Sequence, residues 1–416
     1  MRALHQVFIL AGLDWRLRDL CPFPRVPLIM KRDVALDPID VSLFRPNAVM
    51  LSARLAILVG LLALACSTTS GTRPRPAVSR VQARVDAIVK SVMAKRRIPG
   101  VTLLVEYRGR RIVARGYGLA DVENNVPAEL ETVYQIASLT KQFTAAAILQ
   151  LVEQGKLQLD DDVTKLVPEL HIRGGPVTVH NLLSHTSGLV EYNRDETIPE
   201  WGTAITHKRV LELIGDRELE FKPGEKFQYR NSGYYLLGMI VERVSGMSYA
   251  DYVRVKMFQP LGMRSTSQCT HREIIAKRAH GYTTDDGKLH NARLLDMSWT
   301  FAVGSLCSTA PDLLLWDHAL RSGRVVSPDA YKKMITPVKL ADGTLTDYGY
   351  GLGMSVHDGH PVIRHGGSTV GFTTYLTHYP EDDLTIVLLT NSDSFEAWKV
   401  DDDISRAVLG MAPRRE

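Results

Sequence analysis

The segment Phe143–Gly155, FTAAAILQLVEQG, constrains the fold more than any other part of the chain. Its apolar side chains occupy most of the circumference of a helix, and such a helix is stable only inside a larger protein. Gly155 supplies a stop signal. The sequence therefore predicts a buried helix over residues 138–153. A chain of 416 residues, 45% of them hydrophobic, is long enough to surround it.

Helix and strand signals divide the rest of the folded part into three stretches. An amphipathic helix from Val81 and a β-hairpin around Arg108–Arg110 come first, and helix signals dominate residues 156–300. Strand-like runs and a closing helix fill residues 348–411. We expect an α+β fold, in which an antiparallel sheet built from both chain ends and flanked by helices carries an inserted helical subdomain.

Residues 50–66 have the pattern of an export signal. Arg54 precedes an uninterrupted apolar run from Leu55 to Ala65, which is shorter than the roughly 20 residues that cross a bilayer as a helix. The run ends in LALAC, which resembles the bacterial lipobox and predicts lipidation of Cys66. Ordinary cleavage after the A-L-A site is the alternative. We therefore expect an exported protein of the cell envelope, either anchored to the membrane through Cys66 or released.

Residues 1–49 precede this signal, although export signals normally open a chain. Their prolines and the lack of a sustained hydrophobic period predict no packed domain. Translation from Met50 is our preferred explanation, and a disordered extension is the alternative. Residues 67–80 are small, polar and proline-bearing, as in a flexible linker, so the folded domain is expected over residues 81–412.

Charge and cysteine content exclude several functional classes. The formal net charge of +4 is small and no Lys/Arg run stands out, so we expect no nucleic acid partner. The four cysteines lack C-x-x-C spacing, which argues against a zinc ribbon and a dense disulfide framework, and Cys307 is expected to pack in the core. No dinucleotide-binding, P-loop or H-E-x-x-H motif occurs, so we expect no cofactor and no metal.

Ser138 and Lys141 stand three residues apart at the start of the predicted buried helix. Residues at i and i+3 share a helix face, so the lysine amine can reach the serine hydroxyl. A serine nucleophile needs a base, and a lysine serves only if its surroundings lower its pKa from about 10.4. Taken alone, S-x-x-K favours a helix N-cap beside an ordinary lysine, since it occurs about once or twice by chance in a chain of this length.

Two further polar elements change this interpretation. Tyr229-Arg230-Asn231 precedes a second apolar helix, and His365-Gly366-Gly367 leads into a strand. The order S-x-x-K, [SY]-x-N, [KH]-[TSG]-G resembles the serine β-lactamase and penicillin-binding-protein superfamily, most closely its class C-like branch of β-lactamases, esterases and D-aminopeptidases. The resemblance covers residues 81–412 and includes LLSHTSGL at 182–189.

The resemblance implies roles for the first two motifs. Ser138 would be the nucleophile that becomes acylated, and its backbone N–H would form part of the oxyanion hole. Lys141 and Tyr229 would share proton handling, and the acylation base remains open between them. Asn231 would donate to the substrate amide or orient Lys141.

The third motif would bind substrate through His365, Gly366 and Gly367, and the N–H of Ser368 would complete the oxyanion hole. Penicillin-binding enzymes of the superfamily typically carry lysine at the position of His365. A histidine is only partly charged at neutral pH, so efficient β-lactam hydrolysis is less expected. His185 in LLSHTSGL has no carboxylate beside it that would complete a triad, so we expect it to support the cleft wall.

We therefore expect an exported serine hydrolase that forms an acyl-enzyme on an ester, amide or β-lactam carbonyl of a small molecule or peptide. The alternative is a non-catalytic, penicillin-binding-like sensor or binding protein tethered at the cell envelope.

Overall fold

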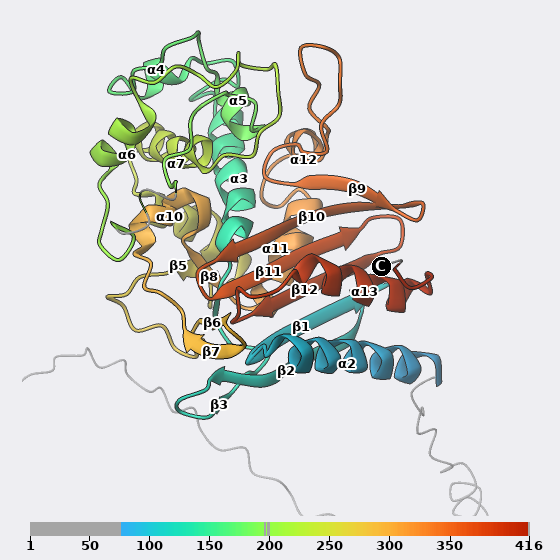
Figure 1. The fold of residues 1–416 in the computed structure, drawn as a ribbon. Coiled ribbons are helices and arrows are strands. Elements are labelled where there is room, and N and C mark those ends of the chain that lie inside the picture. The colour runs from blue at the N-terminus through green and yellow to red at the C-terminus, as the bar shows by residue number, and fades with distance from the viewer. Residues whose placement is uncertain (1–75, 195–196, 198–199, 415–416) are drawn as a thin grey trace, which may run out of the picture. The chain divides into compact units, whose positions relative to one another are not determined.

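A seven-stranded antiparallel sheet joins the two ends of the folded chain (Figure 1). The computed structural model describes residues 76–194, 197 and 200–414. The strand order is β3-β2-β1-β12-β11-β10-β9, so an N-terminal strand lies beside a C-terminal one at the centre, with Val101 opposite Thr390. The strands are β1 Gly100–Tyr107, β2 Arg110–Asp121, β3 Val126–Pro127, β9 Gly353–His357, β10 His360–Thr369, β11 Phe372–Tyr379 and β12 Leu384–Thr390.

Helices cover both faces of this sheet (Figure 1). On one face, α2 (Pro76–Arg96) and α13 (Ala397–Leu409) enclose an apolar core that includes Val85 and Ile404. On the other, α11 (Ala310–Arg321) packs against β1 and β12. Within the described residues, α2 already includes Pro76 and so reaches further toward the N-terminus than the Val81 expected from the sequence. Residues 76–80 of the predicted linker are therefore helical.

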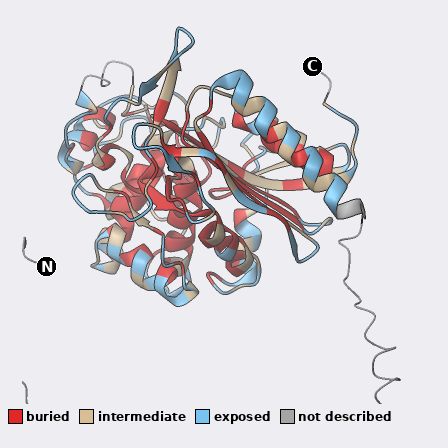
Figure 2. Ribbon diagram, turned by 90° about the horizontal axis from the view of Figure 1, so that it is seen from below, coloured by how far each residue is buried: buried red, intermediate tan, exposed pale blue. Residues whose placement is uncertain are grey.

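The helical part is inserted between the two halves of the sheet, as predicted (Figure 1). Its central helix is α3, and Figure 2 shows buried residues gathered along the inner helices and strands. Among residues 76–194, 197 and 200–414, no helix has the length and apolarity needed to cross a membrane. The helices are α3 Thr140–Glu153, α4 Val163–Leu166, α5 Val179–Leu183, α6 His207–Ile214, α7 Asn231–Ser245, α8 Tyr249–Val253, η3 Arg254–Phe258, α9 Gln259–Leu261, α10 Met297–Gly304 and α12 Pro328–Met334.

The predicted buried helix forms in two pieces. A single 3-10 turn, η1 (Ala137–Leu139), carries Ser138 and runs directly into α3. Eleven of the fourteen residues of α3 are buried, and the Phe143 ring stacks on Trp316 with centroids 3.9 Å apart. The apolar circumference read from the sequence thus corresponds to a helix enclosed by the rest of the domain.

Two small sheets and a disulfide complete the fold. Strand β8 (Leu306–Ser308) lies between β4 (Tyr134–Gln135) and β5 (Ser267–Gln268), while β6 (Tyr282–Asp285) and β7 (Lys288–Asn291) form a hairpin. Cys307 is fully buried, as expected, and forms a disulfide with Cys269 that the sequence did not predict. Cys307 lies on β8, which pairs with β4, and β4 leads into η1. The disulfide therefore anchors β8 next to the turn that carries Ser138.

We expect the Cys269→Ala/Cys307→Ala double variant to lose about 2–4 kcal/mol of unfolding free energy, since the disulfide closes a long loop in the unfolded chain. Urea denaturation with and without dithiothreitol measures the loss. Full alkylation of both cysteines in the native, unreduced protein would contradict the pairing.

Candidate active site

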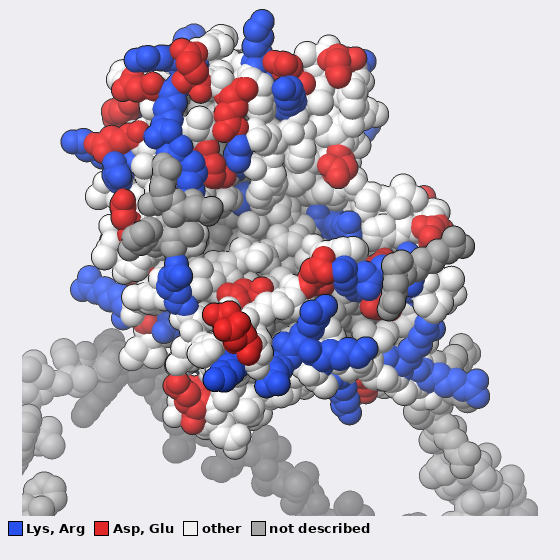
Figure 3. All heavy atoms as spheres, viewed as in Figure 1, with Lys and Arg blue, Asp and Glu red and all other residues white. Residues whose placement is uncertain are grey.

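Ser138 lies where the helical part meets the edge of the sheet. The η1 turn packs against β10, and this close approach requires glycine, because a Cβ on Gly367 would lie 2.3 Å from the Ile136 carbonyl oxygen. Ala137, just before the serine, adopts a left-handed φ of 48°, which costs a non-glycine residue about 1–2 kcal/mol. Figure 3 shows the surface hollowed between the helical part and the sheet.

Lys141 points at the Ser138 hydroxyl. Its Nζ lies 3.0 Å from Ser138 Oγ, 3.0 Å from Asn231 Oδ1 and 3.2 Å from the Val303 carbonyl oxygen. Val303 belongs to the last turn of α10, where carbonyl groups have no intrahelical partner and can accept a bond from elsewhere. Three segments far apart in the sequence therefore fix the position of one amine.

Burial changes the charge state of this amine. Lys141 is fully buried, and desolvation lowers its pKa from 10.5 to about 7, while the charge of Glu191 works in the opposite direction. A substantial fraction of Lys141 is therefore neutral at neutral pH. A lysine needs such a lowered pKa in order to act as the base for a serine nucleophile.

Tyr229 lies on the other side of the serine. The residue is 38% exposed. Desolvation of its phenol raises the pKa of the hydroxyl, and a hydrogen bond with Ser138 opposes that rise. The Lys141 Nζ lies 4.9 Å from the centroid of the Tyr229 ring. The phenol therefore stays protonated at neutral pH, which separates its role from that of the lysine.

Glu191 is a site residue that the sequence analysis missed. Its carboxylate accepts the backbone N–H of Asn231 at 2.7 Å and the Ser232 hydroxyl at 3.2 Å. A negative charge at the N-terminus of α7 interacts favourably with the helix dipole, so Glu191 caps the helix that presents Asn231. Burial raises the pKa of this carboxyl group. No motif indicated it, since its partner lies 40 residues away.

His365 is buried and neutral. Desolvation and the nearby Lys141 lower its pKa from 6.5 to about 3. Its Nδ1 lies 2.6 Å from the Gly366 carbonyl oxygen, so Nδ1–H donates there and Nε2 accepts from the Tyr348 hydroxyl at 2.9 Å. His365 therefore supplies no positive charge to the cleft. Tyr348 is a second neighbour that the sequence did not indicate.

Residues 365–369 of β10 face the cleft. Strand β9 pairs with β10 only as far as Arg364, which leaves the following edge of β10 without a strand on that side. Ser138, Gly366, Gly367 and Ser368 line one hollow together. A side chain on Gly366 would meet the Tyr375 ring at 2.7 Å. The unpaired edge of β10 that follows Arg364 therefore lies beside Ser138.

His185 supports the cleft wall instead of reaching the serine. Its Nδ1 accepts the Arg230 N–H at 3.2 Å, and its ring packs against Tyr229 with centroids 4.2 Å apart. Burial lowers its pKa well below 6.5, so it is neutral. Among the described residues, no carboxylate hydrogen bonds to His185, and no Ser-His-Asp triad forms there.

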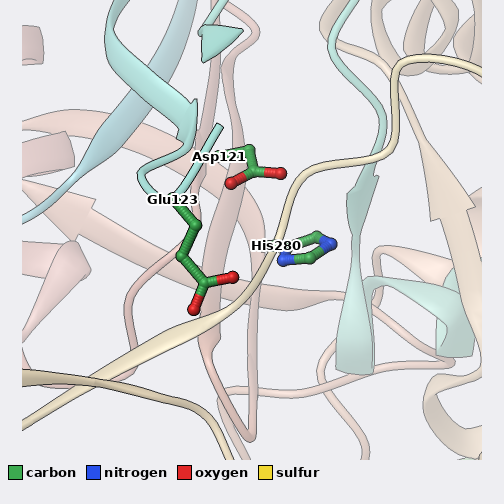
Figure 4. Close-up of side chains that lie close together, drawn as sticks. All are labelled: Asp121, Glu123 and His280. Carbon is green, nitrogen blue, oxygen red and sulfur yellow. The ribbon is translucent and has the colours of Figure 1, made fainter. Parts of the chain in front are cut away.

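A separate polar cluster lies at the end of β2 (Figure 4). Ligand atoms of Asp121, Glu123 and His280 lie within 4.8 Å of one another. The Asp121 carboxylate already accepts the side-chain amide of Asn124, and Glu123 accepts that of Asn291. Glu123 and His280 are exposed. These hydrogen bonds account for the cluster, and we assign it no metal.

Comparison with known proteins shows the family of the chain. The family model named Beta-lactamase matches residues 85–409. The chain belongs to the β-lactamase family. It is a serine hydrolase of that family, which confirms the resemblance carried by the three motifs. The fold prediction is also confirmed, since solved β-lactamase-family structures share it.

The chain is similar to several named proteins. Penicillin-binding protein 4* of Bacillus subtilis is 29% identical over 329 residues, which cover 75% of this chain and 71% of that protein. D-aminopeptidase of Gluconobacter oxydans is 28% identical over 79% of this chain, which spans only 62% of that protein. The octameric penicillin-binding protein homologue of Pyrococcus abyssi superposes with a TM-score of 0.71 at 32% identity, covering 80% of this chain and 78% of that one.

Replacing Glu191 with Gln should shift the acid limb of the kcat/KM profile to lower pH, because the carboxylate charge that raises the pKa of Lys141 is removed. Plateau activity should fall by about threefold to tenfold, since Asn231 loses a charge-assisted bond. Stopped assays between pH 5 and 9 measure both effects. His365, whose pKa burial lowers to about 3, stays neutral over this range, and burial lowers the pKa of His185 well below its usual 6.5.

Glu220→Gln is the matched control. Glu220 pairs with Arg230 at 2.6 Å, so it contacts the residue that precedes the same helix without approaching Lys141. The pH profile of kcat/KM for this variant should coincide with that of the unsubstituted protein. Identical acid limbs in all three proteins would contradict the role of Glu191.

Proposed function

We propose that the chain is an exported serine hydrolase that forms an acyl-enzyme through Ser138 on an ester or amide carbonyl. One observation carries the proposal: a buried lysine whose pKa is about 7 lies 3.0 Å from the serine oxygen. The hydrolase relatives, a D-aminopeptidase and a D-amino acid amidase among them, support the reaction class.

Lys141 is the base for acylation. In the neutral amine, two hydrogens serve Asn231 Oδ1 and the Val303 carbonyl, which leaves the lone pair for the Ser138 hydroxyl proton. The proton passes to Nζ as Oγ bonds to the substrate carbonyl carbon. Tyr229 is the weaker candidate for this step because its phenol stays protonated at neutral pH.

The negative oxygen formed in this step is stabilised by the N–H groups of Ser138 and Ser368. When the intermediate collapses, the bond to the leaving group breaks, and Tyr229 donates its proton to the departing oxygen or nitrogen and regains one from Lys141. Water then attacks the acyl-enzyme by the same steps in reverse, releasing the acid and restoring the Ser138 hydroxyl.

Ester or amide substrates fit this site better than β-lactams. A β-lactam carries a carboxylate that a cation in the third motif would bind. His365 stands at that position and is neutral, because burial lowers its pKa to about 3. The acyl-transfer groups Ser138, Lys141 and Tyr229 do not depend on such a cation.

Export is supported by two features. The signal-like segment 50–66, with its lipobox-like Cys66, lies outside the described residues, and its cleavage and lipidation remain part of the proposal. The Cys269–Cys307 disulfide is typical of proteins that mature in an oxidising compartment.

The full chain should gain one covalent adduct when treated with a fluorophosphonate, and Ser138→Ala should gain none. The same substitution should reduce hydrolysis of p-nitrophenyl acetate by about a thousandfold or more, since the nucleophile is removed. Intact mass and absorbance measure the two effects.

Ser322→Ala, at the end of α11, is the serine control and should behave as the unsubstituted protein. An unlabelled native protein that turns over no ester or amide would favour the tethered binding protein instead.

A further inference from the structure

We infer that the hydrolase proposed above, on which this inference rests, selects substrates whose acyl group is uncharged and apolar, about the size of one aromatic ring or a short branched chain. The inference comes from a hollow beside Ser138, here called the acyl pocket. Its large apolar lining residues are Tyr192, Trp201, Leu295, Trp299, Val303 and Val370.

The leaving group and the acyl group occupy opposite sides of Ser138. Two hollows meet at the serine, and both are also lined by Asn231 and Ser368. Tyr229, the proton donor to the leaving group, lines only the second hollow, together with His365 and Trp398. The departing fragment therefore leaves on the Tyr229 side, and the acyl chain extends into the acyl pocket.

The aromatic walls of the acyl pocket present apolar surface. The Tyr192 hydroxyl donates to the Trp299 carbonyl oxygen, and the Trp299 indole N–H donates to the Thr203 carbonyl oxygen at 2.9 Å. The Trp201 indole N–H donates to Thr197 Oγ1 at 3.2 Å. Because these polar ends are already bonded to protein, the rings offer their apolar surfaces to a bound group.

The volume of the acyl pocket sets an upper size. It is about 130 Å³, close to the roughly 150 Å³ of an apolar cavity that holds one benzene ring. An acetyl group would leave most of this space unfilled, whereas a phenylacetyl or isovaleryl group would bury its apolar surface there. Because each buried methylene adds to the binding free energy, filling the space favours the larger acyl groups.

The described lining of the acyl pocket offers no charged side chain to an acyl group. Within the part of the chain that the structure describes, its lining includes no Lys, Arg, His, Asp or Glu. Glu191, which bonds to the lining residue Asn231, already accepts the Asn231 N–H and the Ser232 hydroxyl. Moving an ammonium or carboxylate from water into such surroundings is costly.

The leaving-group side is no better suited to a carboxylate. His365 is neutral there, and the one charged side chain among the described lining residues, Glu396, is negative and paired with Lys399. A substrate carboxylate on either side of the scissile bond is therefore unfavourable.

The test compares kcat/KM of the full chain on p-nitrophenyl esters of matched acids. The kcat/KM values for the isovalerate and phenylacetate esters should exceed that for the acetate ester by about tenfold or more. This is the range of discrimination that one or two buried methylene groups provide. D- and L-valine esters, which add an ammonium to the isovaleryl skeleton, should fall at least about a hundredfold below isovalerate, and the succinate half-ester should fall similarly below butyrate.

Val370→Asp then tests the acyl pocket itself, because Val370 lies in the β10–β11 turn and is only partly buried. A carboxylate there should raise the valine-to-isovalerate ratio by about tenfold or more, while Val370→Asn, which has the same shape without the charge, should not. A valine ester that matches isovalerate on the unsubstituted protein would overturn the inference.

Acylation of Ser138 separates the two proposals. If acetate acylates the serine but the larger apolar acids show no preference, only the acyl-pocket inference fails. If no ester acylates it, the proposed function fails and the inference fails with it.

Discussion

The burial of one amine is the interaction on which the site depends. Lys141 reaches Ser138 from within α3, a helix that the rest of the domain encloses, and it shares its hydrogens with Asn231 and with the carbonyl end of α10. Desolvation lowers the pKa of this amine, and without that shift a lysine would be protonated and could not accept the serine proton. The packing that buries α3 therefore also gives Lys141 the low pKa that the reaction requires.

Neighbouring groups partly offset the effect of this burial on the pKa of Lys141. Glu191 caps α7 and places a negative charge near Lys141, which raises the pKa of the amine and partly offsets desolvation. A closer carboxylate would hold the lysine as an ammonium ion. Glu191 instead accepts the backbone N–H of Asn231, and the side chain of Asn231 accepts a bond from Lys141. The carboxylate therefore influences the amine without bonding to it directly. The neutral His365 completes surroundings in which the described groups nearest the serine carry little net charge.

Sequence reasoning recovered the parts of this architecture that local patterns encode. The hairpin at Arg108, the C-terminal strands and the apolar helix followed from periodicity and turn residues, and Ser138, Lys141 and Tyr229 followed from motif order. Glu191, Tyr348 and the Cys269–Cys307 disulfide did not. Each acts through a partner distant in the chain, and a single sequence does not show which distant residues meet. The acyl pocket was missed for the same reason, since its walls come from separate loops.

The charge state of Lys141 is the central claim, and a direct titration tests it. NMR of the protein labelled with ¹³C at the lysine ε-carbons, followed from pH 5 to 11, should show one resonance that titrates near pH 7 and disappears in Lys141→Met. A Lys141 resonance that does not change between pH 6 and 8 would contradict the account, because the buried amine would then stay protonated at neutral pH and could not activate Ser138.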